Sequence, residues 1–441
     1  MSVRREKSFD RLAKAMREGS NNRGGTAGNN DAQLRALTEE YLRKGNESER
    51  RELLRRYRAG DSLKGENGIR RALAAMDMAY FGRAYLPHYF SRPSPQFHAE
   101  LDTLWREGVL KGVVPIGDDA KLVDAQDGCR RATAAPRGHA KSTNLTFKGS
   151  LHAALYRYKR YIIILSDTSD QANGFLSAIK DELEDNGAIR EDFGDLTGGV
   201  WRENVIITSH GVRIDAIGAG QKIRGRKHKN WRPDLMVLDD IENDENVRTV
   251  EQRKKLENWF YKAVSKAGDT YTDIVYIGTL LHYDSLLAKV LKNPAYRSVK
   301  YKAVQSFSTS PLWETWESIY TDLGNDGREL EAKSFFERNR AEMLAGTKVL
   351  WEEKLSYYDL MVTRVSEGEA SFNSELQNEP VNPDDCLFNE EWFDYYNPED
   401  MDFSSADFRF YGFVDPSLGK NRRADYSAIL TGALEVPTGY L

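Results

Sequence analysis

The chain has 441 residues, 40% of them hydrophobic, so it can bury large cores and, at roughly 100–200 residues per domain, form two or three domains. No stretch approaches the ~18 consecutive apolar residues of a membrane helix, and the basic N-terminus lacks the apolar core of a signal peptide. Two distant cysteines, Cys129 and Cys386, support neither a disulfide framework nor a zinc site. These features predict a soluble intracellular protein with no membrane partner.

The net charge of −5 is distributed unevenly. Residues 1–80 carry 18 Lys and Arg against 12 Asp and Glu, whereas the remainder carries 45 against 56. An acidic total does not exclude nucleic-acid binding, because polyanions are bound by local basic patches.

The spacing of apolar residues predicts a short basic helix over residues 1–18, a flexible Gly- and Asn-rich linker, and further helix over 32–58. Residues 1–75 are therefore interpreted as an N-terminal helical arm. Two interpretations of this arm stay open, a solvated tail and a docking or DNA-contacting element.

A compact α/β domain is predicted over residues 76–310. Short apolar runs separated by helical stretches favour a mostly parallel, buried sheet. These runs cover residues 112–116, 161–166, 205–208, 235–238 and 274–277. Downstream, we expect a lid or linker subdomain over 311–385, a linker over 386–408, and the beginning of another domain over 409–441, where the strand 408–414 runs into Asp415.

The stretch A-A-P-R-G-H-A-K-S-T, residues 134–143, lies where a predicted strand gives way to a helix, which is the position of a P-loop. Lys141 is predicted to reach the β and γ phosphates, and the Ser142 hydroxyl to bind Mg²⁺. Ala135 and Ala140 replace the two glycines of the usual pattern, so an ordinary basic helix start is the alternative. The predicted nucleotide-contacting residues are Pro136, Arg137, Gly138, His139, Ala140, Lys141, Ser142 and Thr143.

Two carboxylates, Asp239 and Asp240, follow the apolar run 235–238. An NTPase needs one carboxylate in the Mg²⁺ shell and another to orient or deprotonate the attacking water. We assign Asp239 to the metal and Asp240 to the water, with Glu242 as a rival base because its longer side chain could reach the same place. The alternative is a polar turn after a strand.

Two further features flank this acidic pair. The strand 274–277 ends in Gly278 and Thr279, where a hydroxyl could sense the γ-phosphate. Residues 221–232 carry six Lys and Arg and no acid, which suits a phosphodiester backbone or an Arg supplied to the nucleotide; a solvated loop is the alternative. The DNA-binding candidates are Arg224, Arg226, Lys227 and Lys229.

Taken in order, these motifs resemble the large subunit of tailed-bacteriophage terminases, which package viral DNA. The similarity covers roughly residues 85–435 and rests on A-P-R-G-H-A-K-S-T, I-R-G-R, R-P-D-L-M-V-L-D-D-I-E, I-V-Y-I-G-T-L-L-H-Y-D-S-L-L, V-L-W-E-E, F-N-S-E-L-Q-N-E-P and F-V-D-P-S-L-G. The resemblance implies a P-loop ATPase of the additional-strand class, joined to a nuclease of RNase H-like fold.

The resemblance also implies roles for particular residues. Arg137 becomes a transition-state contact, Thr279 a residue that couples hydrolysis to movement, and Gln96 part of the region that reads adenine. Asp415 matches the first metal-binding acid of the nuclease. Because the sequence ends at Leu441 before the remaining ligands, we expect no DNA cleavage by this chain.

The implied function is ATP-driven translocation of double-stranded DNA into a procapsid, with ATP and Mg²⁺ as cofactors and Mg²⁺ or Mn²⁺ for a complete nuclease. The implied partners are duplex DNA, the portal protein, the terminase small subunit and further copies in a homo-oligomeric ring, in the host cytoplasm and transiently on the procapsid. A helicase-like ATPase is one alternative, although no second ATPase-like lobe is evident after residue 311. A non-catalytic packaging scaffold with a degenerate P-loop is the other.

Overall fold

The computed structural model describes residues 27–44, 48–110, 127–380, 403–405, 407–415 and 428–436. The chain divides into two units by its internal contacts: Met1–Ser306 with Lys348–Val381, and Phe307–Thr347 with Asn382–Leu441. The predicted helix over 1–18, the predicted strand at 112–116 and most of the predicted linker 386–408 lie outside the described residues.

The first unit is built around an eight-stranded sheet in the order β3-β4-β5-β2-β6-β7-β1-β8. Every neighbouring pair is parallel except β3–β4 and β4–β5. The strands are β1 (Arg130–Ala134), β2 (Tyr161–Ser166), β3 (Val200–Trp201), β4 (Val205–Ile207), β5 (Arg213–Gly218), β6 (Leu235–Asp239), β7 (Asp273–Gly278) and β8 (Arg297–Lys300). The predicted α/β class with a mostly parallel sheet is confirmed.

The position of β7 identifies the class of sheet. It lies between β1, which leads into the predicted P-loop, and β6, which ends in Asp239. An additional strand therefore separates these two strands, as predicted. Because all three are parallel, their carboxyl ends, with the residues that follow them, meet at one edge of the sheet.

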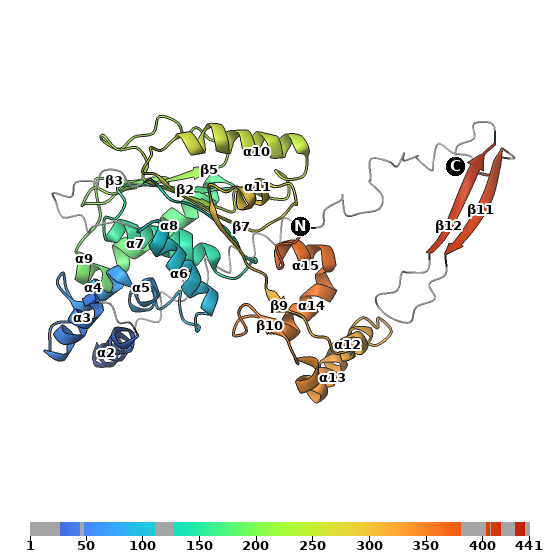
Figure 1. Cartoon of the computed structure of the whole chain (residues 1–441), viewed down its shortest axis with the longest axis horizontal. Coiled ribbons are helices and arrows are strands. Elements are labelled where there is room, and N and C mark those ends of the chain that lie inside the picture. Colours follow the sequence, from blue (N-terminus) through green and yellow to red (C-terminus); the bar gives the residue numbers. More distant parts are fainter. Residues whose placement is uncertain are drawn as a thin grey trace. The chain divides into compact units, whose positions relative to one another are not determined.

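Helices cover both faces of this sheet (Figure 1). Alternation along β2 shows the two faces, since Ile162 and Ile164 belong to one buried cluster and Ile163 and Leu165 to the other. The first face packs against α6 (Gln96–Gly108), the π-helical turn η1 (Thr143–Gly149), α7 (Ser150–Leu155) and α8 (Ser169–Asp185). The second packs against α10 (Val250–Lys262), η2 (Val264–Lys266) and α11 (Leu286–Lys292).

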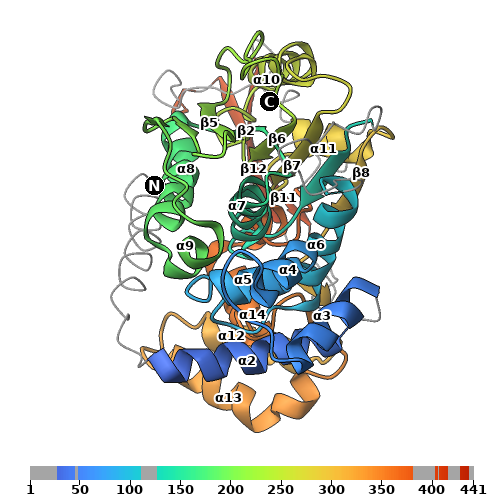
Figure 2. The same cartoon turned by 90° about the vertical axis from the view of Figure 1, so that its left-hand side faces the viewer.

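The described part of the predicted N-terminal arm belongs to the first unit. Its helices are α2 (Ala27–Arg43), α3 (Ser48–Arg58) and α4 (Ile69–Met76). Together with α5 (Met78–Tyr85), the first helix of the predicted core domain, they are grouped below the sheet in Figure 2. Leu42 and Leu73 are fully buried in the same apolar cluster as Ile162 of the sheet. Residues 27–44 and 48–75 are therefore packed onto the α/β core rather than forming a solvated tail.

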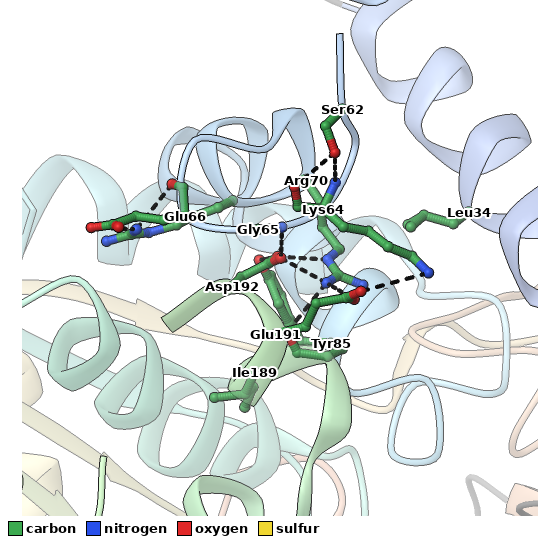
Figure 3. A network of polar contacts seen from close by, with 12 residues as sticks. Leu34, Ser62, Lys64, Gly65, Glu66, Arg70, Tyr85, Ile189, Glu191 and Asp192 are labelled. Atoms are coloured by element: carbon green, nitrogen blue, oxygen red, sulfur yellow. Dashed lines mark hydrogen bonds and ion pairs between the residues drawn. The ribbon is translucent and has the colours of Figure 1, made fainter. Parts of the chain in front are cut away.

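A buried carboxylate fastens this helical group to α9 (Gly187–Phe193) (Figure 3). Asp192 is 1% exposed and accepts hydrogen bonds from the Arg70 guanidinium, at 2.6 and 2.8 Å, and from the Gly65 amide at 2.6 Å. The Tyr85 hydroxyl donates to the same carboxylate. These donors all belong to the N-terminal helices and the turn between them, so the Asp192 side chain joins that helical group to α9.

Replacing Asp192 with Ala should lower the free energy of unfolding by about 3–5 kcal/mol, because the buried Arg70 guanidinium would lose its enclosed partner and keep only the more exposed Glu191 carboxylate. Glu191→Ala is the matched control. Glu191 also pairs with Arg70 but is 42% exposed, so its loss should cost under about 1 kcal/mol. Urea unfolding of both variants measures the difference, and equal small losses would show that Asp192 does not anchor the helices.

The segment 311–385, predicted as one subdomain, is divided between the two units. Helices α12 (Leu312–Tyr320) and α13 (Arg328–Met343) belong to the second unit, whereas α14 (Tyr357–Glu367) and α15 (Glu369–Glu375) belong to the first. The short strands β9 (Val304–Ser306) and β10 (Lys348–Val349) pair where the chain leaves and re-enters the first unit. Within the second unit, β11 (Phe408–Asp415) and β12 (Ala428–Glu435) form an antiparallel hairpin, which includes the predicted strand 408–414.

Candidate nucleotide-binding site

The loop after β1, which is the predicted P-loop, contains two residues with positive φ. Gly138 and Ala140 both adopt left-handed conformations, with φ of 77° and 58°. An L-residue pays roughly 1–2 kcal/mol for this conformation, so Ala140 holds under strain the turn that glycine supplies in the usual pattern. A helix begins at Lys141, and residues Thr143–Gly149 within it are π-helical, a feature frequent at functional sites.

Lys141 brings three of the predicted motifs together. Its side chain is 6% exposed, and Nζ lies 3.0 Å from Thr279 Oγ1 and 3.0 Å from Asp240 Oδ2. Thr279 directly follows β7 and Asp240 directly follows β6. The ammonium group therefore occupies the carboxyl edge of the central strands, where a parallel sheet binds its ligand.

Asp239 is held by two hydroxyls from the helix after the loop. Its Oδ1 accepts a hydrogen bond from Ser142 Oγ at 2.8 Å, and its Oδ2 accepts one from Thr146 Oγ1. Burial and the neighbouring Asp240 charge raise the pKa of Asp239 to about 7. Thr146 was not predicted from the sequence, although its position four residues after Ser142 places both on one side of the helix.

The donors around Asp239 fit Mg²⁺, which prefers hard oxygen ligands and usually binds one or two carboxylates together with water and phosphate oxygens. Ser142 and Asp239 supply a hydroxyl and a carboxylate in contact. No group of three or more His, Cys, Asp or Glu in the described part of the chain could hold a metal alone. A cation bound here would therefore depend on nucleotide phosphates for its remaining ligands.

The raised pKa of Asp239 gives nucleotide binding a defined pH dependence. A folded-state pKa of about 7, against an ordinary value of 3.8, means that Asp239 stabilises the nucleotide-free fold at low pH and loses this contribution as pH rises through 7. Binding of Mg²⁺ needs the carboxylate, so Mg²⁺–nucleotide affinity should fall about tenfold per pH unit below 7 and level off above it. Fluorescent-nucleotide titrations measure this, and Asp239→Asn should flatten the curve; a flat wild-type curve would contradict it.

Asp240 and Glu242, the two rival bases, lie in different surroundings. Asp240 has φ of 43°, and its half-exposed carboxylate is turned toward Lys141. Glu242 is buried and accepts hydrogen bonds from the amides of Leu286 and Leu287, at 2.6 and 2.8 Å, and from the Tyr276 hydroxyl at 2.8 Å. Glu242 thus caps the first turn of α11, which favours Asp240 as the base, while both roles stay predictions.

Residues far along the chain contact the loop, and the sequence alone did not indicate them. The Arg137 amide donates to the Glu375 carbonyl at 2.9 Å, and its guanidinium pairs with the Glu375 carboxylate. Lys354 Nζ donates to the Gly138 carbonyl. The segment F-N-S-E-L-Q-N-E-P, residues 372–380, had no assigned role in the sequence analysis. It contacts the predicted P-loop through Glu375.

A cavity of about 320 Å³ opens beside Ala140 and Thr143. Its other lining residues include Tyr89, Phe90, Arg92, His98, Trp351 and Lys354. His98 lies against the loop, with Nε2 3.0 Å from the His139 carbonyl, and burial lowers the pKa of both histidines to about 4, so they are neutral near pH 7. An aromatic cavity of this size can accept a nucleobase.

Gln96, which the resemblance assigns to adenine reading, does not line this cavity. It is exposed at the start of α6, where its Nε2 donates to Glu100 Oε1 at 3.3 Å, and it lines a second cavity of about 380 Å³. His98, two residues later, is the residue of this segment that contacts the P-loop. Its role was not predicted.

The four DNA-binding candidates differ in environment. Arg226 is turned inward and pairs with Asp215 at 2.8 Å, whereas Arg224, Lys227 and Lys229 are exposed. The side chain of Asp415, the nuclease candidate, lies outside the described residues. Among the helices that the structure describes, none has the length and apolar character needed to cross a membrane.

Comparison with known proteins gives no match to any protein-family model and no significant match to a curated protein. Among solved structures, a mutant ATPase domain of the large terminase from Thermus phage P74-26 is similar, with 12% identity, a TM-score of 0.34, and coverage of 57% of this chain and 89% of that one. The large terminase of bacteriophage HK97 is 16% identical, with a TM-score of 0.27, and the match covers 51% of this chain and 47% of that one. Both of these structures are phage large terminases. At these identities and TM-scores, the geometry of the site has to carry the function.

Proposed function

We propose that this chain is a DNA-dependent ATPase of the terminase large-subunit type, which moves double-stranded DNA into a procapsid. The observation that carries the ATPase proposal is the convergence of separately predicted motifs on one point. Lys141 Nζ lies 3.0 Å from both Thr279 and Asp240, while Ser142 bonds Asp239. Two strand ends and one helix start contribute these residues, and chance motif matches would not be expected to meet.

The site can divide the work of hydrolysis among these side chains. Triphosphate oxygens would take the place of Asp240 and Thr279 beside Lys141, whose charge then compensates the charge that develops on the transferred phosphoryl group. Bound Mg²⁺ would neutralise phosphate charge beside Ser142 and Asp239. Asp240, released from Lys141, would orient the attacking water and accept its proton.

Arg137 and Thr279 would report the state of the nucleotide. In the structure, Arg137 is held by Glu375, so contact with a phosphate requires it to leave this partner. Thr279 is buried between Lys141 and the Ala135 carbonyl, 3.4 Å away, and would respond when Lys141 shifts. Both residues thus join the phosphate site to distant segments of the chain.

The proposed partners are duplex DNA, a portal protein, a terminase small subunit and further copies of the chain in a ring, in the host cytoplasm and on the procapsid.

The proposed nuclease domain begins with the β11–β12 hairpin, where Phe410, Phe413, Ile429 and Leu430 are more than half exposed. These apolar side chains suit strands that pack against further structure. Asp415, the proposed first nuclease ligand, is the last residue of β11.

An ATPase assay with and without duplex DNA tests the proposal. A packaging motor should hydrolyse ATP faster when duplex DNA is present, a scaffold should show no hydrolysis, and a helicase should separate strands under the same conditions. Stimulation by DNA without strand separation is the expected result. Absence of hydrolysis with both DNA and Mg²⁺ present would overturn it.

A further inference from the structure

The segment between β5 and β6, residues 221–232, is called the basic loop below. Its side chains alternate between inward and outward positions. Ile223 and His228 are buried and Arg226 is half-buried, whereas the intervening cations are exposed. The exposed cations are Lys222, Arg224, Lys227 and Lys229.

A buried carboxylate under the loop holds Arg226. Asp215, in the middle of β5, is 1% exposed and accepts a bidentate pair of hydrogen bonds from Arg213, at 2.7 and 3.0 Å. Arg226 Nη1 lies 2.8 Å from Asp215 Oδ2, and the Tyr161 hydroxyl donates to the same oxygen at 2.7 Å. A charged pair this enclosed is geometrically specific, so it fixes where the middle of the loop lies.

The loop is fastened at both ends as well. Trp259 Nε1 donates to the Gln221 carbonyl at 2.9 Å, and His228 Nε2 lies 2.9 Å from the Gly211 carbonyl. The Arg160 guanidinium lies over the Trp231 ring, with Cζ 4.1 Å from the ring centroid. Inward contacts thus recur along the loop, which is held as a rigid surface element.

The outward cations contrast with these anchored residues. No ion pair joins Lys222, Arg224, Lys227 or Lys229 to an acid in the parts of the chain that the structure describes, whereas Arg213 and Arg226 both pair with Asp215. A solvated loop would not need a buried Asp215 beneath it, because enclosing a carboxylate costs desolvation free energy. Rigid, unpaired cations in a row suit a partner that itself carries regularly spaced negative charge.

We infer that the basic loop is a contact surface for the phosphates of duplex DNA, and that Asp215 is the positioning residue that holds it through Arg226. The inference rests on the proposed function, which supplies DNA as the partner. Arg224, Lys227 and Lys229 face the phosphates, with Lys222 beside them. Arg226 contributes no phosphate contact, although it carries the same positive charge as Arg224 and Lys227 and lies between them in the sequence.

Two substitutions that each remove one positive charge separate these roles. Each phosphate contact contributes about 0.9 to the slope of log K against log salt concentration. Arg224→Gln should therefore lower the slope by about one unit. Arg226→Gln should leave the slope unchanged and weaken binding about tenfold at every salt concentration, because a loosened loop must be ordered when DNA binds.

The measurement is binding of the full chain to a fluorescent duplex across a range of salt concentrations, with Lys333→Gln on α13 as an exposed control. In the Arg226→Gln background, Arg224→Gln should still lower the slope by about one unit, because the loosened loop is ordered when DNA binds and keeps that phosphate contact. Asp215→Asn should resemble Arg226→Gln, and thermal melting shows whether that variant is folded. If Asp215→Asn does not fold, Arg226→Gln still tests the inference, because in that variant Asp215 keeps its hydrogen bonds from Arg213 and Tyr161.

The outcomes are distinct. Equal slope losses for Arg224→Gln and Arg226→Gln would make Arg226 a phosphate contact and overturn the positioning role. Unchanged slopes for every loop variant, with wild-type DNA binding intact, would show that DNA binds elsewhere and leave the proposed function standing. Absence of wild-type DNA binding, and of stimulation of the ATPase by DNA, would overturn both.

Discussion

A Lys141→Ala variant should lose ATP hydrolysis by at least about 10²–10³-fold while keeping its fold. Removal of one preorganised charge from a developing anion has an effect of this size. Lys141 is bonded only to Thr279 and Asp240 among the described contacts, and Asp239 keeps its bonds to Ser142 and Thr146 without it. The loss should therefore appear in turnover rather than in unfolding.

Steady-state turnover and a thermal melt of the same preparation test this expectation. Lys266→Ala, an exposed substitution in η2, is the control for loss of a positive charge and should be near wild type in both measurements. Near-normal turnover in Lys141→Ala would end the assignment of residues 134–143 as a P-loop. A large fall in melting temperature would instead make Lys141 a structural residue.

The parts of the site that the sequence predicted are those fixed by local chemistry. A run such as 235–238 is apolar throughout because β6 is buried on both faces, and the polar residues that follow must emerge at the sheet edge. The same reasoning placed Asp239, Thr279 and the loop before Lys141 at strand ends. Parallel pairing then brings these ends together, as the structure confirms.

The missed parts depend on contacts between distant segments or on conformations that composition conceals. Glu375 meets Arg137 across 238 positions, and no local pattern marks that pair. Ala140 has a left-handed backbone conformation that its side chain disfavours. The sequence did not indicate this conformation, because glycine is the residue expected at such a position. Strand β5 was not predicted, because Arg213 and Asp215 within it resemble a polar turn until their pairing with each other is known.

The assignment of the base should be decided by comparing Asp240→Asn with Glu242→Gln. Asp240→Asn should bind Mg²⁺–nucleotide with nearly wild-type affinity and lose about 10²–10⁴-fold in turnover, since a base acts mainly in the transition state. Asp239→Asn should instead weaken Mg²⁺–nucleotide binding, because a metal ligand already acts in the ground state. Nucleotide titrations and turnover at saturating ATP separate these effects.

Glu242→Gln should give the opposite pattern, because the structure engages this carboxylate with the first amides of α11 and with Tyr276. An amide can accept through only one oxygen, so a buried donor loses its partner, at a cost of about 1–3 kcal/mol in the free energy of unfolding. Turnover per folded molecule should stay within a few-fold of wild type. If Glu242→Gln instead folds and binds nucleotide normally but does not turn over, then Glu242 leaves its cap when ATP binds, and it rather than Asp240 is the base.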